Sequence, residues 1–148
     1  MGKFVAALAS IVFMATTHAR AQTMPEYATH VLVGSWQLVK FVDSNGQGVV
    51  PDNKANYTLD FDAQGKVSVR FDCDSGTTKW ATASKGEIHF EPLTLSQAAC
   101  PKGSLHNRLV KDWLLIRSYT QQNGQLYLAL AAEGGSYHFE PVGPGKGK

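Results

Sequence analysis

The chain has 148 residues, of which 43% are hydrophobic and 18% charged, and its formal net charge is +2. This length suits a single domain with a full hydrophobic core. The one basic cluster is the Gly- and Pro-rich end at 143–148, which we expect to be a flexible tail. Nucleic-acid-binding domains usually carry a basic patch or stripe, so we expect no nucleic-acid partner.

The first 21 residues have the pattern of a secretory signal peptide. Lys3 precedes an apolar run at 4–15, and the small-residue sequence Ala-Arg-Ala follows at 19–21. The apolar run is too short to span a bilayer, which takes about 20 residues. We therefore predict cleavage between Ala21 and Gln22, a periplasmic or secreted protein, and no membrane span after the signal is removed.

The mature chain begins with residues 22–32, which we interpret as a short polar leader. The next segment, 34–42, alternates so that Trp36 and Leu38 share one face, as in a half-buried strand. A cluster of turn residues at 43–48 ends this strand.

Two hairpins are predicted next. Strands 56–61 and 66–71 flank the sequence Asp-Ala-Gln-Gly, in which the glycine can take a positive φ. Strands 79–83 and 87–93 flank Ser-Lys-Gly at 84–86. We leave the segment between these hairpins as a loop.

The hydrophobic period then changes to that of a helix over 105–117, with Ser104 as its N-cap. His106 lies in the first turn, where we see no partner for it. The residues with helical spacing are Leu105, Leu109, Trp113 and Ile116.

The chain ends with three predicted strands. Two of them, 119–122 and 125–129, flank Asn123-Gly124, which is a strong hairpin signal. The last is 136–142. The whole pattern predicts an α+β domain with a mostly antiparallel, strongly curved or barrel-like sheet of about eight strands and one helix packed on it.

The chain contains two cysteines, Cys73 and Cys100. In an oxidising compartment two thiols are the minimum for one disulfide. They could instead be reactive thiols or metal ligands, but the chain has no Cys-x-x-Cys motif and export disfavours free thiols. We favour a structural disulfide.

Several short motifs occur in a characteristic order: GSWQL at 34–38, FDAQGKV at 61–67, DCDSG at 72–76 and TLSQAACP at 94–101. Together they resemble the META domain family, which includes the HslJ-like exported proteins of bacteria. The resemblance covers residues 33–142, so we divide the chain into the signal, the leader, this domain and the tail.

The resemblance implies a compact antiparallel β-barrel-like domain with a helix, in which Cys73 pairs with Cys100. It also implies a protein of the cell envelope connected with stress response, without a settled enzymatic activity. One departure is Asp74, which stands where the family usually has Asn.

The acids on either side of Cys73 are the first candidates for chemistry. Asp72 and Asp74 could share one face of an extended chain and form a general acid/base pair. The interpretation we favour is a solvated loop in which they cap local turns. If the domain binds a partner, we place a tentative binding surface at Arg70, Asp72, Asp74, Lys79 and Trp80.

No metal site or cofactor is expected. Asp60 and Asp62 begin like a calcium loop, but the twelfth position is Phe71 rather than a bidentate Glu. We interpret this segment as a hairpin turn. His89 and His138 could meet across a sheet, but a third ligand is not in view.

The motifs G-x-S-x-G and H-E-x-x-H are absent from the sequence, and we assign no catalytic residue. We expect a non-enzymatic, monomeric envelope protein that binds another envelope protein or a cell-wall component. The alternative is a carrier of a small apolar ligand in a barrel cavity lined by Val67, Val69, Phe90 and Trp113. A small hydrolase using Asp72 and Asp74 comes after it.

Overall fold

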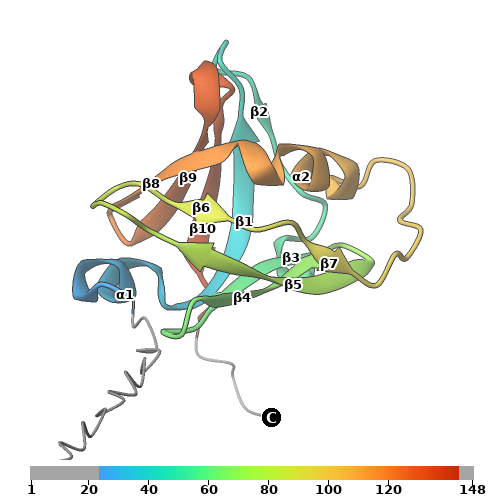
Figure 1. Cartoon of the computed structure of the whole chain (residues 1–148). Helices are drawn as coiled ribbons and strands as arrows, with labels where there is room; N and C mark the ends of the chain where they lie inside the picture. The colour runs from blue at the N-terminus through green and yellow to red at the C-terminus, as the bar shows by residue number, and fades with distance from the viewer. Residues whose placement is uncertain (1–23, 144–148) are drawn as a thin grey trace, which may run out of the picture.

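The computed structural model describes residues 24–143. The expected signal peptide, its cleavage site and the tail after residue 143 lie outside the described residues. Within them, ten strands form one antiparallel sheet (Figure 1). Eight strands lie in the order β6-β5-β4-β3-β1-β10-β9-β8, while β2 pairs with β1 and β7 pairs with β5.

The strands are β1 (Gly34–Val42), β2 (Gly48–Val49), β3 (Tyr57–Phe61), β4 (Lys66–Phe71), β5 (Asp74–Ala81), β6 (His89–Phe90), β7 (Thr94–Leu95), β8 (Ile116–Gln122), β9 (Gln125–Leu130) and β10 (Ser136–Pro141). The α-helices are α1 (Glu26–Leu32) and α2 (His106–Asp112). Short 3-10 turns are η1 (Lys54–Asn56), η2 (Trp113–Leu115) and η3 (Ala131–Glu133). No helix in this part of the chain is both long and apolar enough to cross a membrane.

The sheet nearly closes into a barrel where the β5–β6 hairpin meets β8. The Ile88 N–H donates to the Arg117 carbonyl at 3.0 Å, and the Tyr119 N–H donates to the Gly86 carbonyl at 2.9 Å. Glu87 and Ser118 form an antiparallel bridge between these bonds. This contact joins the two ends of the sheet over a few residues, and the predicted α+β fold with a barrel-like sheet is confirmed.

The interior is filled by side chains that alternate along the strands. In β4, Val67, Val69 and Phe71 are buried, whereas the residues between them are exposed. The Trp113 ring lies 4.2 Å from that of Phe90 and 5.7 Å from that of Phe71, measured between centroids. These side chains occupy the region where the sequence suggested a ligand cavity, which argues against a carrier of that design.

The interpretation of residues 22–32 as a polar leader was wrong for the part that the structure describes. α1 buries Ala28 and Leu32 completely in the core. The Trp36 indole N–H donates to the Leu32 carbonyl at 2.8 Å. The apolar stripe of this helix is only two turns long, so the polar residues around it hid the pattern.

The predicted helix over 105–117 is shorter than expected. α2 ends at Asp112, η2 follows it, and Ile116 begins β8 opposite Leu130. Ile116 is buried as a residue of strand β8, and its three-residue spacing from Trp113 matches a helical repeat only by coincidence. The Ser104 hydroxyl accepts a hydrogen bond from the His106 N–H at 3.2 Å, although the N-cap position itself is Leu105.

The expected loop around the first cysteine is a tight hairpin instead. Phe71 of β4 pairs directly with Asp74 of β5, and Asp72 turns the chain with a φ of 64°. β5 therefore begins five residues earlier than the strand predicted at 79–83. A side chain at Gly76 would overlap the Thr94 carbonyl, so the glycine lets β7 approach β5 closely.

Candidate functional site

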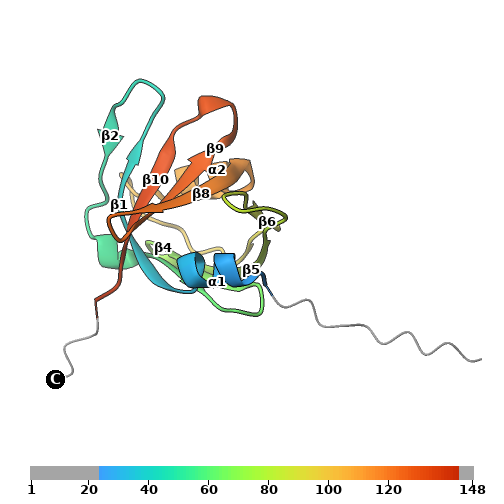
Figure 2. The same ribbon diagram turned by 90° about the vertical axis from the view of Figure 1, so that its left-hand side faces the viewer.

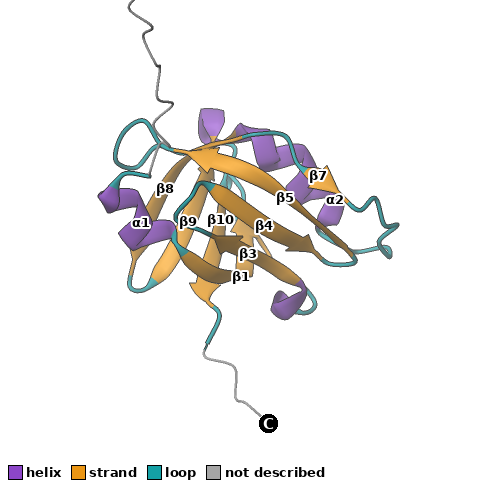
Figure 3. Cartoon of the chain, turned by 60° about the horizontal axis from the view of Figure 1, so that its bottom comes forward, coloured by secondary structure: helices purple, strands orange, loops and turns teal. Residues whose placement is uncertain are grey.

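The two ends of β5 lie in different environments. Figure 3 shows β7 and α2 beside one end of this strand and α1 near the other. We call the first the disulfide end and the second the mouth of the barrel. An extended strand rises about 3.3 Å per residue, so Asp74 and Trp80 lie roughly 20 Å apart along β5.

At the disulfide end, Cys73 and Cys100 form a disulfide with a Cα–Cα distance of 5.3 Å. The bond joins the β4–β5 turn to the segment before α2 and closes a loop with a sequence separation of 27. The chain-entropy model gives such a loop a stabilisation of roughly 3.5 kcal/mol. The pair is therefore part of the scaffold.

Asp74 lies beside the disulfide with only 1% of its surface exposed. Its Oδ1 accepts hydrogen bonds from the Ser75 N–H at 2.9 Å and from the Ser96 hydroxyl, and its Oδ2 lies 3.0 Å from His106 Nε2. The bond from Ser96 is the main cause that holds the pKa of Asp74 below its usual range, against the opposing effect of burial. Asp74 is ionised and internally bonded at neutral pH.

We call Asp74, Ser96 and His106 the polar clamp, because they tie β5, the segment after β7 and α2 together. The expectation that His106 has no partner was wrong. His106 Nδ1 also lies 3.0 Å from Asn107 Oδ1, so both ring nitrogens have a neighbour. No signal in the sequence indicated this contact, because His106 lies 32 positions from the carboxylate that it contacts.

The polar clamp contains a Ser, a His and an Asp, but their hydrogen bonds are not arranged as in a catalytic triad. In a triad the histidine lies between the serine and the aspartate and takes the serine proton. Here Ser96 and His106 both bind Asp74, on different oxygens. The serine hydroxyl therefore lacks the contact with a histidine base that activates the serine of a triad.

The structure also corrects the interpretation of Asp72 and Asp74 as either a solvated loop or an acid/base pair. Asp74 is buried, and its lowered pKa is the opposite of what a general acid needs. Asp72 holds the turn, and its N–H donates to the Asn56 carbonyl at 2.8 Å. Asp72 therefore shapes the turn of the hairpin, and Asp74 ties the start of β5 to Ser96 and His106.

The tentative binding surface is not assembled as one face. Asp74 and Trp80 are each 1% exposed. Arg70 is exposed at the disulfide end, where its Nε–H donates to the Asp72 carbonyl at 3.2 Å. Lys79 is exposed at the other end of β5. Of the five residues, only Lys79 and Trp80 lie together at a cleft.

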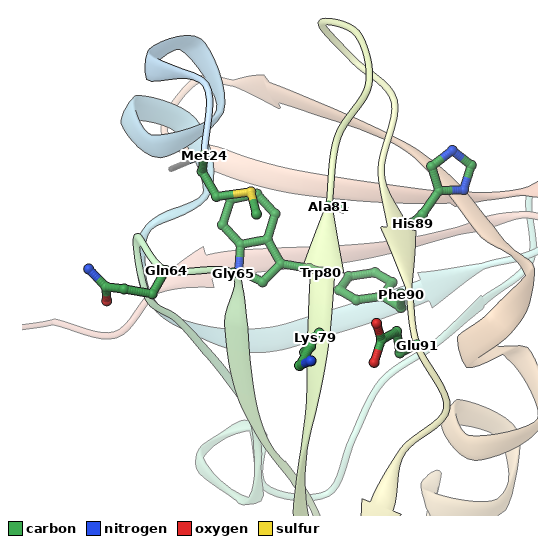
Figure 4. Close-up of a pocket in the computed structure, with 9 residues that line it drawn as sticks. All are labelled: Met24, Gln64, Gly65, Lys79, Trp80, Ala81, His89, Phe90 and Glu91. Carbon is green, nitrogen blue, oxygen red and sulfur yellow. The ribbon is translucent and has the colours of Figure 1, made fainter. Parts of the chain in front are cut away.

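That cleft lies at the mouth of the barrel and has a volume of about 520 Å³, within the range of ligand sites. We call it the Trp80 cleft. It is bordered by Met24, two residues before α1, by the β3–β4 turn and by the facing ends of β5 and β6 (Figure 4). Its lining residues are Met24, Gln64, Gly65, Lys79, Trp80, Ala81, His89, Phe90 and Glu91.

Trp80 forms the inner wall of the cleft. Its ring packs edge-on against Phe61, with 5.6 Å between centroids. Its Nε1–H is buried and has no hydrogen-bond partner. Burying such a donor unpaired costs about 1–3 kcal/mol. An unpaired donor in a residue that lines a cleft therefore marks the cleft as a candidate binding site.

The rim of the cleft is charged. Lys79 and Glu91 lie on facing strand segments, where the Glu91 N–H donates to the Lys79 carbonyl at 3.0 Å. The ion pairs of the described residues are Glu26–His30, Lys54–Glu140 and Asp74–His106, so the side chains of Lys79 and Glu91 are not bridged. Figure 4 shows both beside Phe90.

The sequence predicted two of the nine residues that line this cleft, Lys79 and Trp80. The expected hairpin around 84–86 is confirmed, although its second strand, predicted over 87–93, is only the two residues of β6. In this hairpin Trp80 lies opposite Phe90 and Ala81 opposite His89. The same pairing places His89, Phe90 and Glu91, which the predicted binding surface did not include, beside Lys79 and Trp80. Met24 could not be found, because its position depends on α1.

The remaining candidates for metal binding take other roles. His89 and His138 lie on β6 and β10, which are not neighbours in the sheet. Ser136 Oγ lies 2.8 Å from His138 Nε2. Burial is the main cause that lowers the pKa of His138, and the charge of nearby Lys40 lowers it further. Asp62 Oδ1 accepts two backbone N–H bonds within its turn, as the hairpin interpretation requires. In residues 24–143 no three metal-ligating side chains cluster together.

Comparison with known proteins identifies the family. The model of the META domain matches residues 29–141. The chain belongs to the META domain family. A search of curated proteins gave no match.

Two solved structures share the fold of this META domain. An NMR structure of a protein from Burkholderia xenovorans has a TM-score of 0.64 at 18% identity, and the alignment covers 90% of this chain and all of the other. A crystal structure of a DUF4847 family protein from Bacteroides vulgatus has a TM-score of 0.57 at 14% identity, covering 76% of this chain and 95% of the other. These likenesses show the fold alone.

Proposed function

We propose that this META domain is an exported, non-enzymatic binding protein of the bacterial cell envelope with a role in stress response. Its partner would be an envelope protein or a cell-wall component, held at the Trp80 cleft. The observation that carries the proposal is the contrast in hydrogen bonding within the domain. Asp74 at the disulfide end is bonded internally, whereas the Trp80 indole and the rim charges are left unpaired.

The geometry of the polar clamp supports a non-enzymatic role. The Ser96 hydroxyl donates to the Asp74 carboxylate, and the lowered pKa of Asp74 makes it a weak base for that proton as well as a poor acid. The group that most resembles an active site in composition therefore works as a structural tie.

Export is supported by two features of different kinds. The N-terminal pattern fits a signal peptide that is cleaved between Ala21 and Gln22. The disulfide suits an oxidising compartment such as the periplasm. We expect the mature protein to be a periplasmic or secreted monomer. Mass spectrometry of the exported protein tests this, because the mature mass should correspond to residues 22–148.

The partner site is tested by photo-crosslinking in living cells. A photo-crosslinking amino acid at position 89 samples the Trp80 cleft, and one at position 102 samples an exposed loop at the disulfide end. We expect a discrete adduct from position 89 only, and we expect Lys79→Ala or Glu91→Ala to weaken it. An adduct from position 102 alone, or one from position 89 that neither variant changes, would contradict the proposal.

A further inference from the structure

A second cleft lies on the other side of α1. We call it the Tyr119 cleft. It has a volume of about 460 Å³ and shares none of its lining residues with the Trp80 cleft. Figure 2 shows α1 at the mouth of the barrel, across from β8. The lining residues are Tyr27, Val31, Lys85, Gly86, Tyr119, Thr120 and Gln121.

The walls of the Tyr119 cleft are largely apolar and well supported. Tyr27 and Val31 lie four positions apart on α1 and both pack partly against the core. On the opposite wall, the Tyr119 N–H bond to the Gly86 carbonyl fixes β8 to the tip of the β5–β6 hairpin. The cleft is therefore built across the seam that closes the barrel.

One polar group at this cleft is unusual. Tyr119 is 4% exposed, and its hydroxyl is buried without a hydrogen-bond partner. Buried tyrosine hydroxyls are normally paired. The hydroxyl has almost no accessible surface, so it can donate a hydrogen bond to an acceptor in the cleft only when the side chains that cover it move aside.

The charge of the cleft points to the nature of that acceptor. Lys85 is exposed and is the only charged residue of the lining, so the cleft has a cation without an opposing carboxylate. Lys85 is not part of any ion pair of the described residues. A hydroxyl donor and an ammonium group together suit an anionic oxygen acceptor.

We propose that the Tyr119 cleft binds a small amphipathic carboxylate. The apolar body of the ligand lies against Tyr27 and Val31, and its carboxylate accepts a hydrogen bond from the Tyr119 hydroxyl and pairs with Lys85. This site is separate from the proposed partner site, so either can fail without the other.

Three probes of equal chain length test the proposal with the mature, oxidised protein. Octanoate has the required carboxylate, 1-octanol lacks the charge, and octylamine reverses it. We expect octanoate to bind saturably in an NMR titration and to shift amide signals of α1, the hairpin tip and β8. We expect 1-octanol to bind more weakly and octylamine to bind weakest.

Two variants test the named contacts. Lys85→Gln and Tyr119→Phe should each weaken octanoate binding about ten-fold, the effect of losing one charge-assisted contact. Tyr119→Phe should fold normally, because the hydroxyl that it removes has no partner in the protein. Lys79→Gln, at the Trp80 cleft, is the matched control and should leave octanoate binding unchanged.

The proposal fails if octanoate shows no saturable binding, or if octylamine binds as tightly. It also fails if octanoate binds but neither Lys85→Gln nor Tyr119→Phe weakens the binding. Crosslinking at position 89 is independent of these results, so a failure here leaves the partner site at the Trp80 cleft to its own test.

Discussion

The disulfide end and the mouth of the barrel both contain buried polar side chains, but these differ in whether they are hydrogen-bonded within the protein. At the disulfide end, a buried carboxylate, a serine, a histidine and a tyrosine all bond within the protein. At the mouth, the Trp80 indole and the Tyr119 phenol are buried without a partner, and both residues line clefts. The third such group of the described residues is the Trp113 indole, which packs against Phe90. This contrast is the basis of the proposal that one end holds the fold together and that the other binds a partner.

Breaking the disulfide should give the largest effect on stability. In Cys73→Ser/Cys100→Ser we expect the free energy of unfolding to fall by roughly 3.5 kcal/mol, because the unfolded chain regains the entropy of an open loop. Urea unfolding of the variant and of the oxidised protein measures the difference. An unchanged urea midpoint would remove the disulfide from the account of the scaffold.

Two buried tyrosines, one at each end, allow the hydrogen bonding of the two ends to be compared directly. Tyr57 and Tyr119 are each 4% exposed. The Tyr57 hydroxyl accepts a hydrogen bond from the Leu105 N–H at 3.0 Å, whereas the Tyr119 hydroxyl is unpaired. Tyr57→Phe should lower the free energy of unfolding by about 1–3 kcal/mol, since it leaves a buried N–H without a partner.

The matched variant Tyr119→Phe should leave the free energy of unfolding unchanged or raise it slightly, because it removes an unpaired buried hydroxyl. Both variants are compared in the same urea series. Equal losses in the two would mean that the hydroxyls do not differ in the way that the comparison requires.

The polar clamp should contribute a smaller, pH-dependent part of the stability. The folded-state pKa of Asp74 is lowered, so its contribution is fully present above the pKa of an unfolded Asp, about 3.9. The contribution is lost as the pH falls through the folded pKa. The stability gap between the protein and Asp74→Asn should therefore be constant from pH 7 to 5 and shrink below pH 4. A gap that widens with acid would contradict this assignment.

The sequence predicted those parts of the fold in which the pattern is local. The β4 strand could be read from Val67, Val69 and Phe71 alone, and the Asn123-Gly124 turn needed only its two residues. The β5 boundary was missed because its turn uses Asp72 in a left-handed conformation, where a glycine would have been the usual signal. Local chemistry was enough where each residue acts on its neighbours.

The candidate sites depend on contacts between distant segments, and this is why the sequence predicted them only in part. Asp74 meets His106 because the barrel and the disulfide bring α2 to the β4–β5 turn. Tyr27 meets Tyr119 at one cleft only once α1 is recognised as a helix. Trp80 and Phe90 were within reach because they face each other in one hairpin.

The difference between the two ends is tested most directly by measuring stability and crosslinking together in two variants. Ser96→Ala weakens the polar clamp, and Glu91→Gln removes a charge from the rim of the Trp80 cleft. We predict that Ser96→Ala lowers the urea midpoint and leaves the crosslink from position 89 intact. Glu91→Gln should weaken the crosslink and leave the midpoint unchanged. The reverse pattern, with binding lost in Ser96→Ala and kept in Glu91→Gln, would contradict the account.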